Sequence, residues 1–577
     1  MSWQENYQVW QQQPTMIPSI KHELDAIADD PEALEAAFSG PMSFGTAGMR
    51  GVMGPGIGQM NVYTVRQATE GVARYLDTLD DATKQRGVAI SFDSRYHSTE
   101  FAHEAAHVLG AHGIPSFVFD DLRPTPELSF AVRQLHTAMG IMITASHNPK
   151  QYNGYKIYGP DGGQMPPKAS DMITDFVRSA KDVFAIKVAD EQQLRADKTL
   201  QIIGENIDQP YLRNVESVTI NHELVKSVGK SMKLIYTPLH GTGKVIGERA
   251  LRGAGFENFT MVPEQAIADP EFPTVPFPNP EFAQAFDMAI ALGKKEGADL
   301  LVATDPDADR LGAAVRQPNG DYQLLTGNQI ASILLAYILK ARKQAGQLPA
   351  NSRVVKSIVS TELATKIAAA YGVEMKNVLT GFKFIAEQIH QYETTNDHTF
   401  LFGFEESYGY LIKPFVRDKD AIQSTVLLAE VAADYKQRGM TLYDGIEELY
   451  ATYGYFAEKT TFEEFAGIDG AKQMAHLMSE FRENAPKAFG DSTIESVEDF
   501  STSLKTEADG TTSKIDLPQS NVLKYWLSDG TWICIRPSGT EPKVKFYIGT
   551  SDQTDAVAQK KLASYEAALK QYVDSVK

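Results

Sequence analysis

The chain has 577 residues, of which 43% are apolar and 22% charged, so it is too long for a single core and too ordinary in composition for a disordered or fibrous protein. Its formal charge of −19 disfavours nucleic acid or an anionic membrane as a partner, because binding either requires a basic face. A phosphorylated small molecule is compatible with this charge, since its recognition needs only a local positive cluster.

The first residues show no targeting signal. Met1 to Asn6 lack a basic region and an apolar region, and no later stretch approaches the length of a membrane span. Cys534 is the only cysteine, so no intrachain disulfide can form and zinc sites built on cysteine are excluded. We therefore expect an unprocessed, cytoplasmic protein.

The N-terminal third predicts alternating helices and buried strands. Residues 15 to about 40 read as one polar helix, and the glycine-rich segment 44–51 reads as irregular. From Asn61 onward, helical patterns alternate with short apolar runs at residues 87–92, 116–119 and 139–143. Such alternation is typical of βαβ units with mostly parallel strands.

The same pattern recurs twice further along the chain, from residue 232 to 304 and from 354 to 402. The segment after about residue 460 differs: it has charged helical stretches, two strands around Arg536 and a final helix from Thr554. The fold class expected is α/β, with three similar α/β domains containing mixed sheets and a smaller C-terminal α+β domain. The expected boundaries are residues 1–205, 206–322, 323–455 and 456–577. No low-complexity linker separates them, which suggests four domains packed around a central cleft.

Four polar loops each follow an apolar run that reads as a buried strand. They are residues 144–149, 305–310, 403–407 and 536–543. In α/β sheets, ligands bind just outside the carboxyl ends of the strands, where backbone groups and helix N-termini point. These loops are therefore the first candidates for functional residues.

The first loop, Thr144-Ala145-Ser146-His147-Asn148-Pro149, holds a serine hydroxyl out of the predicted sheet. Ser146 is a candidate nucleophile in this position. The alternative is an ordinary capped turn, because serine and asparagine are common turn formers.

The second loop carries Asp305, Asp307 and Asp309, which alternate along the chain. In an extended loop, three such carboxylates can converge on one hard cation, and without a cation their proximity would be costly. A calcium-binding loop is excluded, because its sixth and twelfth positions would be Arg310 and Arg316. A dehalogenase-type phosphatase loop, with Asp305 as nucleophile, and a solvated acidic loop are the alternatives.

The last two loops suit a phosphorylated polyol. Arg536 to Lys543 combine two cations, two hydroxyls and a glycine in a tight turn, whose backbone N–H groups could form an anion site. Glu405 and Ser407 offer hydrogen bonds to sugar hydroxyls. A plain hairpin turn and an exposed acidic turn are the respective alternatives.

Two further motifs resemble known signatures without completing them. His103-Glu104-Ala105-Ala106-His107 matches the pattern of zinc proteases, but the third ligand of one such class would fall on Gly113, so a solvated helix face is the expected interpretation. His240-Gly241-Thr242-Gly243-Lys244 resembles a nucleotide loop, but Pro238 and Val245 break that pattern.

Taken in order, the four loops resemble those of the α-D-phosphohexomutases, and the resemblance covers essentially the whole chain. Residues 44–51, with Met60-Asn61 and Tyr63-Thr64-Val65-Arg66, are similar to the longer phosphoglucomutase and phosphopentomutase branch. Gly58-Gln59 departs from an expected Asn-Arg pair and puts only local contacts in doubt.

The resemblance implies a role for individual residues. Ser146, beside His147, would carry a phosphoryl group, and Mg²⁺ would be held by the phosphoserine with Asp305, Asp307 and Asp309. Lys156 and Lys383 match positions proposed for acid/base work, and Arg50 and Arg310 match positions that support the transferring phosphoryl group. Glu405 and Ser407 would contact the sugar; Arg536, Ser538, Gly539, Thr540 and Lys543 would hold the phosphate that is not reacting.

The expected activity is interconversion of glucose 1-phosphate and glucose 6-phosphate by an intramolecular phosphotransferase, with glucose 1,6-bisphosphate as primer and intermediate. A preference for pentose or mannose phosphates is the nearest alternative. A metal-dependent sugar phosphatase or an inactive sugar-phosphate binder is the alternative from another class. Sugar phosphates are the only partners expected, for a monomer or a homodimer.

Overall fold

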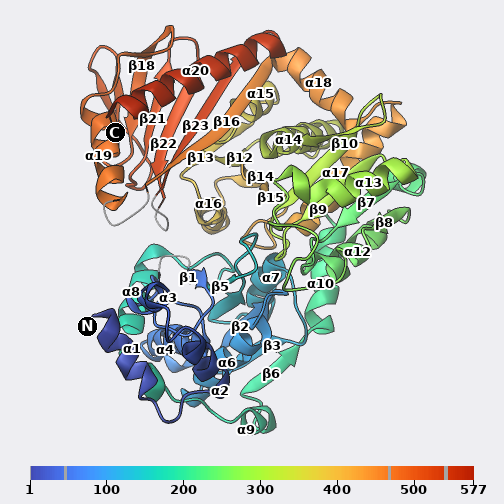
Figure 1. Cartoon of the computed structure of the whole chain (residues 1–577). Coiled ribbons are helices and arrows are strands. Elements are labelled where there is room, and N and C mark those ends of the chain that lie inside the picture. The colour runs from blue at the N-terminus through green and yellow to red at the C-terminus, as the bar shows by residue number, and fades with distance from the viewer. Residues whose placement is uncertain (1, 45–47, 466–469, 539–542, 577) are drawn as a thin grey trace.

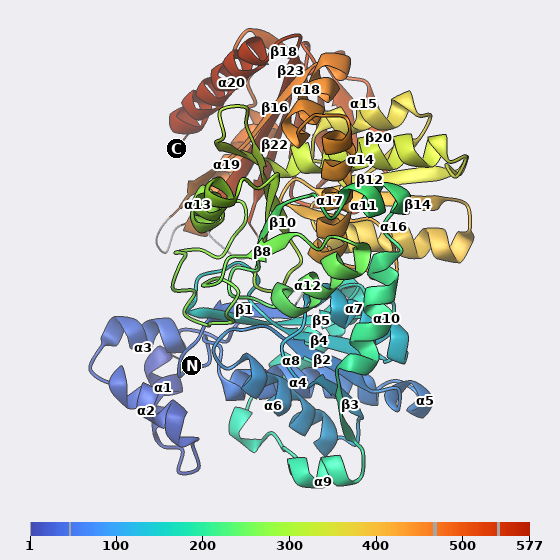
Figure 2. The same ribbon diagram turned by 90° about the vertical axis from the view of Figure 1, so that its right-hand side faces the viewer.

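Four β-sheets follow one another along an arc in the computed structural model, which describes residues 2–44, 48–465, 470–538 and 543–576 (Figure 1). We name the parts built on these sheets domains I to IV, in chain order. Helices flank the sheets in each of them (Figure 2). The four-domain α/β architecture predicted from the sequence is confirmed.

Domain I is built on a six-stranded sheet in the order β1-β5-β4-β2-β3-β6. The strands β2, β3, β4 and β6 run parallel, as the alternation of helices and apolar runs predicts, and β5 and β1 add an antiparallel edge. The central strands β2 and β4 are buried throughout, because helices cover both faces of the sheet. The strands are β1 (Gly48–Val52), β2 (Val88–Phe92), β3 (Ser116–Phe119), β4 (Met139–Ile143), β5 (Tyr152–Tyr158) and β6 (Leu200–Ile203).

The helices of domain I include a separate N-terminal group that packs around Trp10 and Phe38. They are α1 (Trp3–Gln11), α2 (Pro18–Ala26), α3 (Pro31–Phe38), α4 (Val62–Asp77), α5 (Asp81–Lys84), α6 (Ser98–Ala111), α7 (Thr125–Leu135), α8 (Pro167–Ser179) and α9 (Glu191–Ala196), with a short 3₁₀ turn at Val183–Ala185.

Two predictions for this N-terminal region are wrong. Residues 15–40 form two helices, because Pro31 is the first residue of α3 and Asp30 caps it by accepting hydrogen bonds from two backbone N–H groups. Residues 48–51 belong to β1, where Gly48 has φ 111° and a Cβ would lie 1.9 Å from the carbonyl oxygen of Tyr155. Glycine therefore permits a close strand pairing here.

Domain II carries a five-stranded sheet in the order β11-β10-β9-β7-β8. Its strands are β7 (Leu234–Thr237), β8 (Phe259–Met261), β9 (Leu300–Thr304), β10 (Leu311–Arg316) and β11 (Tyr322–Leu325). Its helices are α10 (Glu205–Glu216), α11 (His222–Val228), α12 (Gly243–Ala254) and α13 (Asp287–Glu296), the last preceded by a 3₁₀ turn at Ala283–Phe286. The predicted apolar run at 300–304 is β9, which is buried throughout.

Domain III carries a four-stranded sheet in the order β13-β12-β14-β15. Its strands are β12 (Ser352–Ser357), β13 (Glu374–Val378), β14 (Thr399–Glu405) and β15 (Gly409–Leu411). Its helices are α14 (Gly327–Gln344), α15 (Glu362–Ala370), α16 (Phe382–Thr395), α17 (Ala421–Gln437) and α18 (Leu442–Tyr453). One hydrophobic core joins this domain to domain II, since β9 and α17 contribute to the same cluster.

Domain IV is an antiparallel sheet crossed by the long helix α20 (Figure 1). Its strands are β16 (Tyr455–Glu464), β17 (Ala488–Phe489), β18 (Ser492–Asp499), β19 (Leu504–Glu507), β20 (Thr512–Lys514), β21 (Leu523–Leu527), β22 (Trp532–Pro537) and β23 (Lys543–Asp552); its helices are α19 (Gly470–Glu483) and α20 (Asp555–Val576). The final helix agrees with the prediction. The sheet has more strands than the two predicted, because charged, half-exposed strands such as β16 lack a clear apolar run.

None of the helices in the described parts of the chain has the length and apolar composition required to cross a membrane. Cys534 lies buried in β22.

Candidate active site

The loop after β4 and the loop after β9 meet at the boundary between domains I and II. The hydroxyl of Ser146 donates a hydrogen bond to Oδ2 of Asp305 at 2.7 Å, and Nδ1 of His147 lies 3.1 Å from the same hydroxyl. Both loops follow fully buried strands, so the sheets of the two domains hold them in place. The structure thus brings together the first two of the four predicted loops.

The Ser146 loop is held in an unusual conformation. Ser146 has φ 51°, in the left-handed region, and is 4% exposed. Its backbone N–H donates to Oγ1 of Thr144 at 2.8 Å, and the hydroxyl of Thr144 donates to Asp93 at 2.6 Å. Strained backbone of this kind persists where surrounding contacts over-determine it and is frequent at functional sites.

Arg95 is the main support of this loop. Its guanidinium is buried and donates to four backbone carbonyl oxygens over 2.5 to 3.0 Å, those of Ser146, Asn148, Pro149 and Tyr152. Asp93 lies 3.2 Å from the Nε atom of Arg95. The sequence analysis missed Arg95, although Asp93-Ser94-Arg95 is also a polar loop after a buried apolar run, β2.

The three aspartates of the second loop converge. Asp305, Asp307 and Asp309 each offer a carboxylate oxygen within 4.8 Å of the others, and all three side chains are buried. Oδ1 of Asp305 accepts hydrogen bonds from the N–H groups of Asp309 and Arg310, which folds the loop back on itself. Within the part of the chain that the structure describes, Oδ1 of Asp307 and Oδ1 of Asp309 are buried without a hydrogen-bond partner. A group of hard oxygen donors in this state can hold a metal ion.

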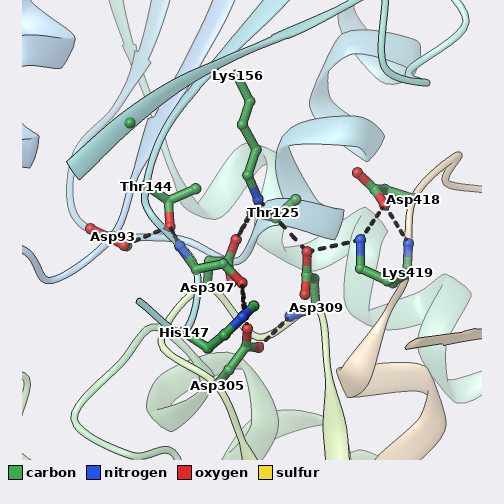
Figure 3. A network of polar contacts seen from close by, with 12 residues as sticks. Asp93, Thr125, Thr144, His147, Lys156, Asp305, Asp307, Asp309, Asp418 and Lys419 are labelled. Carbon is green, nitrogen blue, oxygen red and sulfur yellow. Dashed lines mark hydrogen bonds and ion pairs between the residues drawn. The ribbon is translucent and has the colours of Figure 1, made fainter. Parts of the chain in front are cut away.

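Two lysines balance this negative charge (Figure 3). Nζ of Lys156, from β5, lies 2.9 Å from Asp307 and 3.8 Å from Asp309. Nζ of Lys419, which precedes α17, lies 3.1 Å from Asp309 and 3.0 Å from Asp418. Lys419 was missed by the sequence analysis, since neither an apolar run nor a glycine-rich turn marks it.

The protonation states follow from burial and from these charges. Burial lowers the pKa of Lys156, but the charges of Asp307 and Asp309 outweigh it and leave the pKa above its usual value. Burial raises the pKa of Asp305 well above its usual value, and the neighbouring Asp307 and Asp309 add to this shift. Burial and the charges of Arg310 and Arg50 hold the pKa of His147 well below its usual value, so its imidazole is neutral.

The two predicted arginines differ in their contacts with these loops. Nη1 of Arg50, from β1, donates to Oδ1 of Asn148 at 3.0 Å. Nη1 of Arg310 donates to Oε1 of Glu281 at 2.6 Å, while its Nε is buried and has no hydrogen-bond partner among the residues that the structure describes. Arg50 thus contacts the serine loop directly, whereas Arg310 is paired with an acidic residue outside the four loops.

Lys419 links the predicted sugar-binding residue Glu405 of domain III to the aspartate loop, because its charge acts on Glu405 and its Nζ contacts Asp309. Glu405 is buried at the end of β14, and its Oε1 accepts a hydrogen bond from the N–H of Gly381 at 2.7 Å. The N-terminal end of α16, which carries Lys383, is thereby fastened to Glu405. Burial raises the pKa of Glu405, and the charge of Lys419 opposes that shift. Ser407 follows in the same turn and is half-buried, whereas Glu406 accepts hydrogen bonds from Ser357 and Ser360.

In domain IV, the predicted phosphate loop connects β22 to β23. Arg536 follows the buried residues of β22 and is half-buried, and its Nε atom is buried without a hydrogen-bond partner among the described residues. The N–H of Ser538 donates to the carbonyl oxygen of Lys543 at 2.8 Å, which closes the base of the loop. Gly539 and Thr540 lie outside the described residues. Lys545, paired with Arg536 across the two strands, is a further cation that the sequence analysis missed.

Comparison with known proteins identifies the family. Models of the phosphoglucomutase/phosphomannomutase family match the chain in order: α/β/α domain I at residues 41–183, domain II at 209–320, domain III at 326–453 and the C-terminal domain at 481–563. Curated phosphoglucomutases from strains MRSA252 and COL of Staphylococcus aureus are 40% identical over 91% of the chain and 92% of their own length. The chain belongs to the phosphoglucomutase/phosphomannomutase family. The resemblance drawn from the four loops is confirmed, and with it the enzyme class, an isomerase that transfers a phosphoryl group within its substrate.

Solved structures of the family share the fold at low sequence identity. Paramecium pp63/parafusin, described as a phosphoglucomutase in an open form, has a TM-score of 0.67 at 18% identity and covers 93% of this chain and 96% of its own. A phosphoglucomutase/phosphomannomutase family protein from Burkholderia thailandensis has a TM-score of 0.65 at 17% identity, with 91% and 96% covered. At these identities the likeness concerns the fold alone.

Proposed function

We propose that the protein interconverts glucose 1-phosphate and glucose 6-phosphate, with Ser146 as the phosphoryl carrier and glucose 1,6-bisphosphate as the intermediate. The observation that carries this proposal is the position of the Ser146 hydroxyl, 2.7 Å from Asp305 in a group of three buried carboxylates. A hydroxyl beside a cation site, with several cations around it, suits phosphoryl transfer, which depends on positioning and charge neutralisation. The glucose assignment draws on the curated relatives, which are named phosphoglucomutases.

Asp305, Asp307 and Asp309, together with the phosphorylated Ser146, would hold Mg²⁺. The donor set fits this ion, since all donors are hard oxygens and two of the buried oxygens have no hydrogen-bond partner in the described parts of the chain. When bound, Mg²⁺ would neutralise charge on the oxygens of the phosphoryl group.

The first half-reaction moves the phosphoryl group from Ser146 to the sugar phosphate. The bond between Oγ of Ser146 and phosphorus breaks as an oxygen of the sugar hydroxyl bonds to phosphorus, and the hydroxyl proton passes to a base. The resulting bisphosphate turns over in the site, and its other phosphoryl group returns to Oγ of Ser146.

The base that accepts the proton of the sugar hydroxyl must be neutral or easily deprotonated. Burial lowers the pKa of Lys383, and that of His147 lies well below its usual value, so both are candidates. Lys156 is held protonated by Asp307 and Asp309, so in this arrangement it acts as a cation. Arg50 and Arg310 would stabilise charge on the transferring group.

Sugar and distal phosphate would be bound by domains III and IV. Glu405 and Ser407 would accept and donate hydrogen bonds to ring hydroxyls, and the loop from Arg536 to Lys543, which includes Ser538, Gly539 and Thr540, would hold the phosphate that is not reacting. The predicted domain boundaries, the central cleft, the monomeric or dimeric state and the cytoplasmic location stay predictions.

Two measurements test this function. Coupled assays on glucose, mannose, galactose and ribose 1-phosphates should give the highest kcat/KM for glucose, with the C4 epimer disfavoured more than the C2 epimer, because unpaired hydroxyl-reading groups are costly. A higher kcat/KM for ribose 1-phosphate would instead make the protein a phosphopentomutase. Intact mass before and after phosphatase treatment should show loss of one phosphoryl group; release of inorganic phosphate without isomerisation would indicate a phosphatase.

A further inference from the structure

A second group of metal-ligand side chains lies in domain I. His103 and His107 project from α6 four residues apart, and Glu191 begins α9. Oε2 of Glu191 lies 3.0 Å from Nε2 of His107 and 3.4 Å from Nδ1 of His103. The backbone supports this approach, because the N–H of Ala189 donates to the carbonyl oxygen of His107 at 3.0 Å. In Figures 1 and 2, α9 lies at the edge of domain I farthest from domains III and IV.

The distances from the Glu191 carboxylate to the two imidazole nitrogens match those between two ligands of a four-coordinate metal ion. Zinc binds imidazole nitrogen and carboxylate oxygen at about 2.0 to 2.2 Å, so two ligands of a tetrahedral site lie about 3.3 Å apart. The two distances from Glu191, 3.0 and 3.4 Å, bracket this value. All three ligand atoms lie within 4.8 Å of one another. Two imidazoles and one carboxylate form a borderline donor set, which favours zinc over the magnesium suited to three aspartates.

The residues around this group orient the ligands. Arg195 contacts Oε1 of Glu191 at 2.6 Å, which turns Oε2 toward the two imidazoles. Nδ1 of His107 lies 3.8 Å from Oε1 of Glu104, whose other oxygen pairs with Arg66 at 2.7 Å. A carboxylate behind the second nitrogen of a histidine is the usual outer support of a metal ligand.

The hydrogen bonding of His103 also favours a metal site. Nδ1 of His103 is buried and lacks a hydrogen bond of good geometry among the described residues. Burial lowers the pKa of His103, which keeps the imidazole in the neutral form that binds metals.

We propose that His103, His107 and Glu191 form a binding site for a zinc-class transition-metal ion, with water as the fourth ligand. The ion would fasten α9 to α6, two elements that the chain connects only through the long segment between residues 111 and 191. The site is separate from the aspartate loop and takes no part in phosphoryl transfer. The protease pattern in the sequence supplied two of the three ligands; Glu191, 84 residues beyond His107, completes the site only in the fold.

Zinc binding to the full-length, chelator-stripped protein tests this proposal. Titration calorimetry with zinc chloride is done in excess magnesium chloride, which competes for the aspartate loop. We expect one zinc per chain, with the affinity lowered at least tenfold in His107→Gln and in Glu191→Gln. His112→Gln is the matched control: His112 lies at the end of the same helix, but its two nitrogens face different carboxylates, of Asp77 and Glu70, and it should bind zinc like the wild type.

Thermal unfolding provides an independent measurement. Zinc should raise the Tm of the wild type and of His112→Gln but not that of Glu191→Gln, because only a ligand of the native state stabilises it. Thermal unfolding without metal shows whether each variant is folded. If His107→Gln does not fold, Glu191→Gln alone tests the proposal. Unchanged zinc affinity in the folded variants, or loss of zinc binding on Asp307→Asn instead, would overturn the proposal.

Discussion

The hydroxyl of Ser146 and the carboxylate of Asp305 lie 2.7 Å apart although 159 residues separate them in the chain. Each residue lies in a short loop that directly follows a buried central strand, β4 in domain I for Ser146 and β9 in domain II for Asp305. The contact places the proposed phosphoryl carrier at the proposed cation site. The following predictions test the groups that build this arrangement.

Replacing Ser146 by alanine should abolish mutase turnover and leave the protein folded. The loss in kcat should be on the order of 10³-fold or more, as for removal of other nucleophiles that act with their neighbours. Coupled assays and intact mass measure it, with Ser227→Ala, on a distant helix, as the control. Substantial turnover in the alanine variant would rule out the phosphoserine mechanism.

The change Asp307→Asn should weaken the response to magnesium and lower kcat together. It removes one of three converging charges and the ion pair with Lys156. Activity is measured against magnesium concentration and after EDTA treatment, with Asp321→Asn as an exposed control in the same domain. If EDTA leaves the wild type fully active, the metal assignment is wrong.

Arg95→Ala should impair both catalysis and stability. The variant leaves four carbonyl oxygens of the Ser146 loop without their donor and Asp93 as an uncompensated buried charge, at a cost of about 3 to 5 kcal/mol. Arg95→Lys keeps the charge but cannot reach all four carbonyls, so kcat should fall with less loss of stability. Chemical denaturation and kcat are measured on both. A lysine variant with wild-type kcat would show that the loop keeps its shape without the guanidinium.

Arg536→Ala should raise KM more than it lowers kcat, because the proposed phosphate grip serves binding in both half-reactions. Lys545→Ala should act in the same direction, since the two residues are paired across β22 and β23. Lys514→Ala, on the exposed strand β20, is the matched control. An unchanged KM for both phosphosugars in Arg536→Ala would place the distal phosphate elsewhere.

Because of Lys524, the free energy of unfolding should change with pH in the alkaline range. It is buried, donates to the carbonyl of Ile358 in domain III at 2.7 Å, and burial together with the charge of Lys356 lowers its pKa to about 8. As the pH falls from about 10.5 to 8, Lys524 takes up a proton in the unfolded state while it is still neutral in the folded state. Protonation therefore stabilises the unfolded state and lowers the free energy of unfolding. Relative to Lys524→Met, the wild type should therefore gain roughly 3 kcal/mol between pH 8 and 10.5.

Denaturation of both proteins at pH 7.5 and pH 10 measures this difference, with Lys514→Met as the control for an exposed lysine. A gap between wild type and Lys524→Met that does not change with pH would contradict the lowered pKa.

Much of the fold follows from local patterns. The apolar runs before residues 144 and 305 are β4 and β9, because a strand buried on both faces must be apolar along its whole length. The polar residues after them form loops at the strand ends, as expected. Local sequence patterns did not predict the strands whose formation depends on pairing with a neighbouring strand. β1 contains glycines that only its pairing with β5 makes regular, and β16 is half-exposed and charged.

The sequence by itself therefore determined the fold class, the family and most of the candidate catalytic residues, since buried strands and loop chemistry leave a mark within a few neighbouring residues. Only the tertiary structure decided which side chains meet. Arg95 supports the serine loop, Lys419 pairs with Asp309, and Glu191 joins His103 and His107. These contacts join residues far apart in the chain, and their distances are set by the packing of helices and sheets, which no local periodicity encodes.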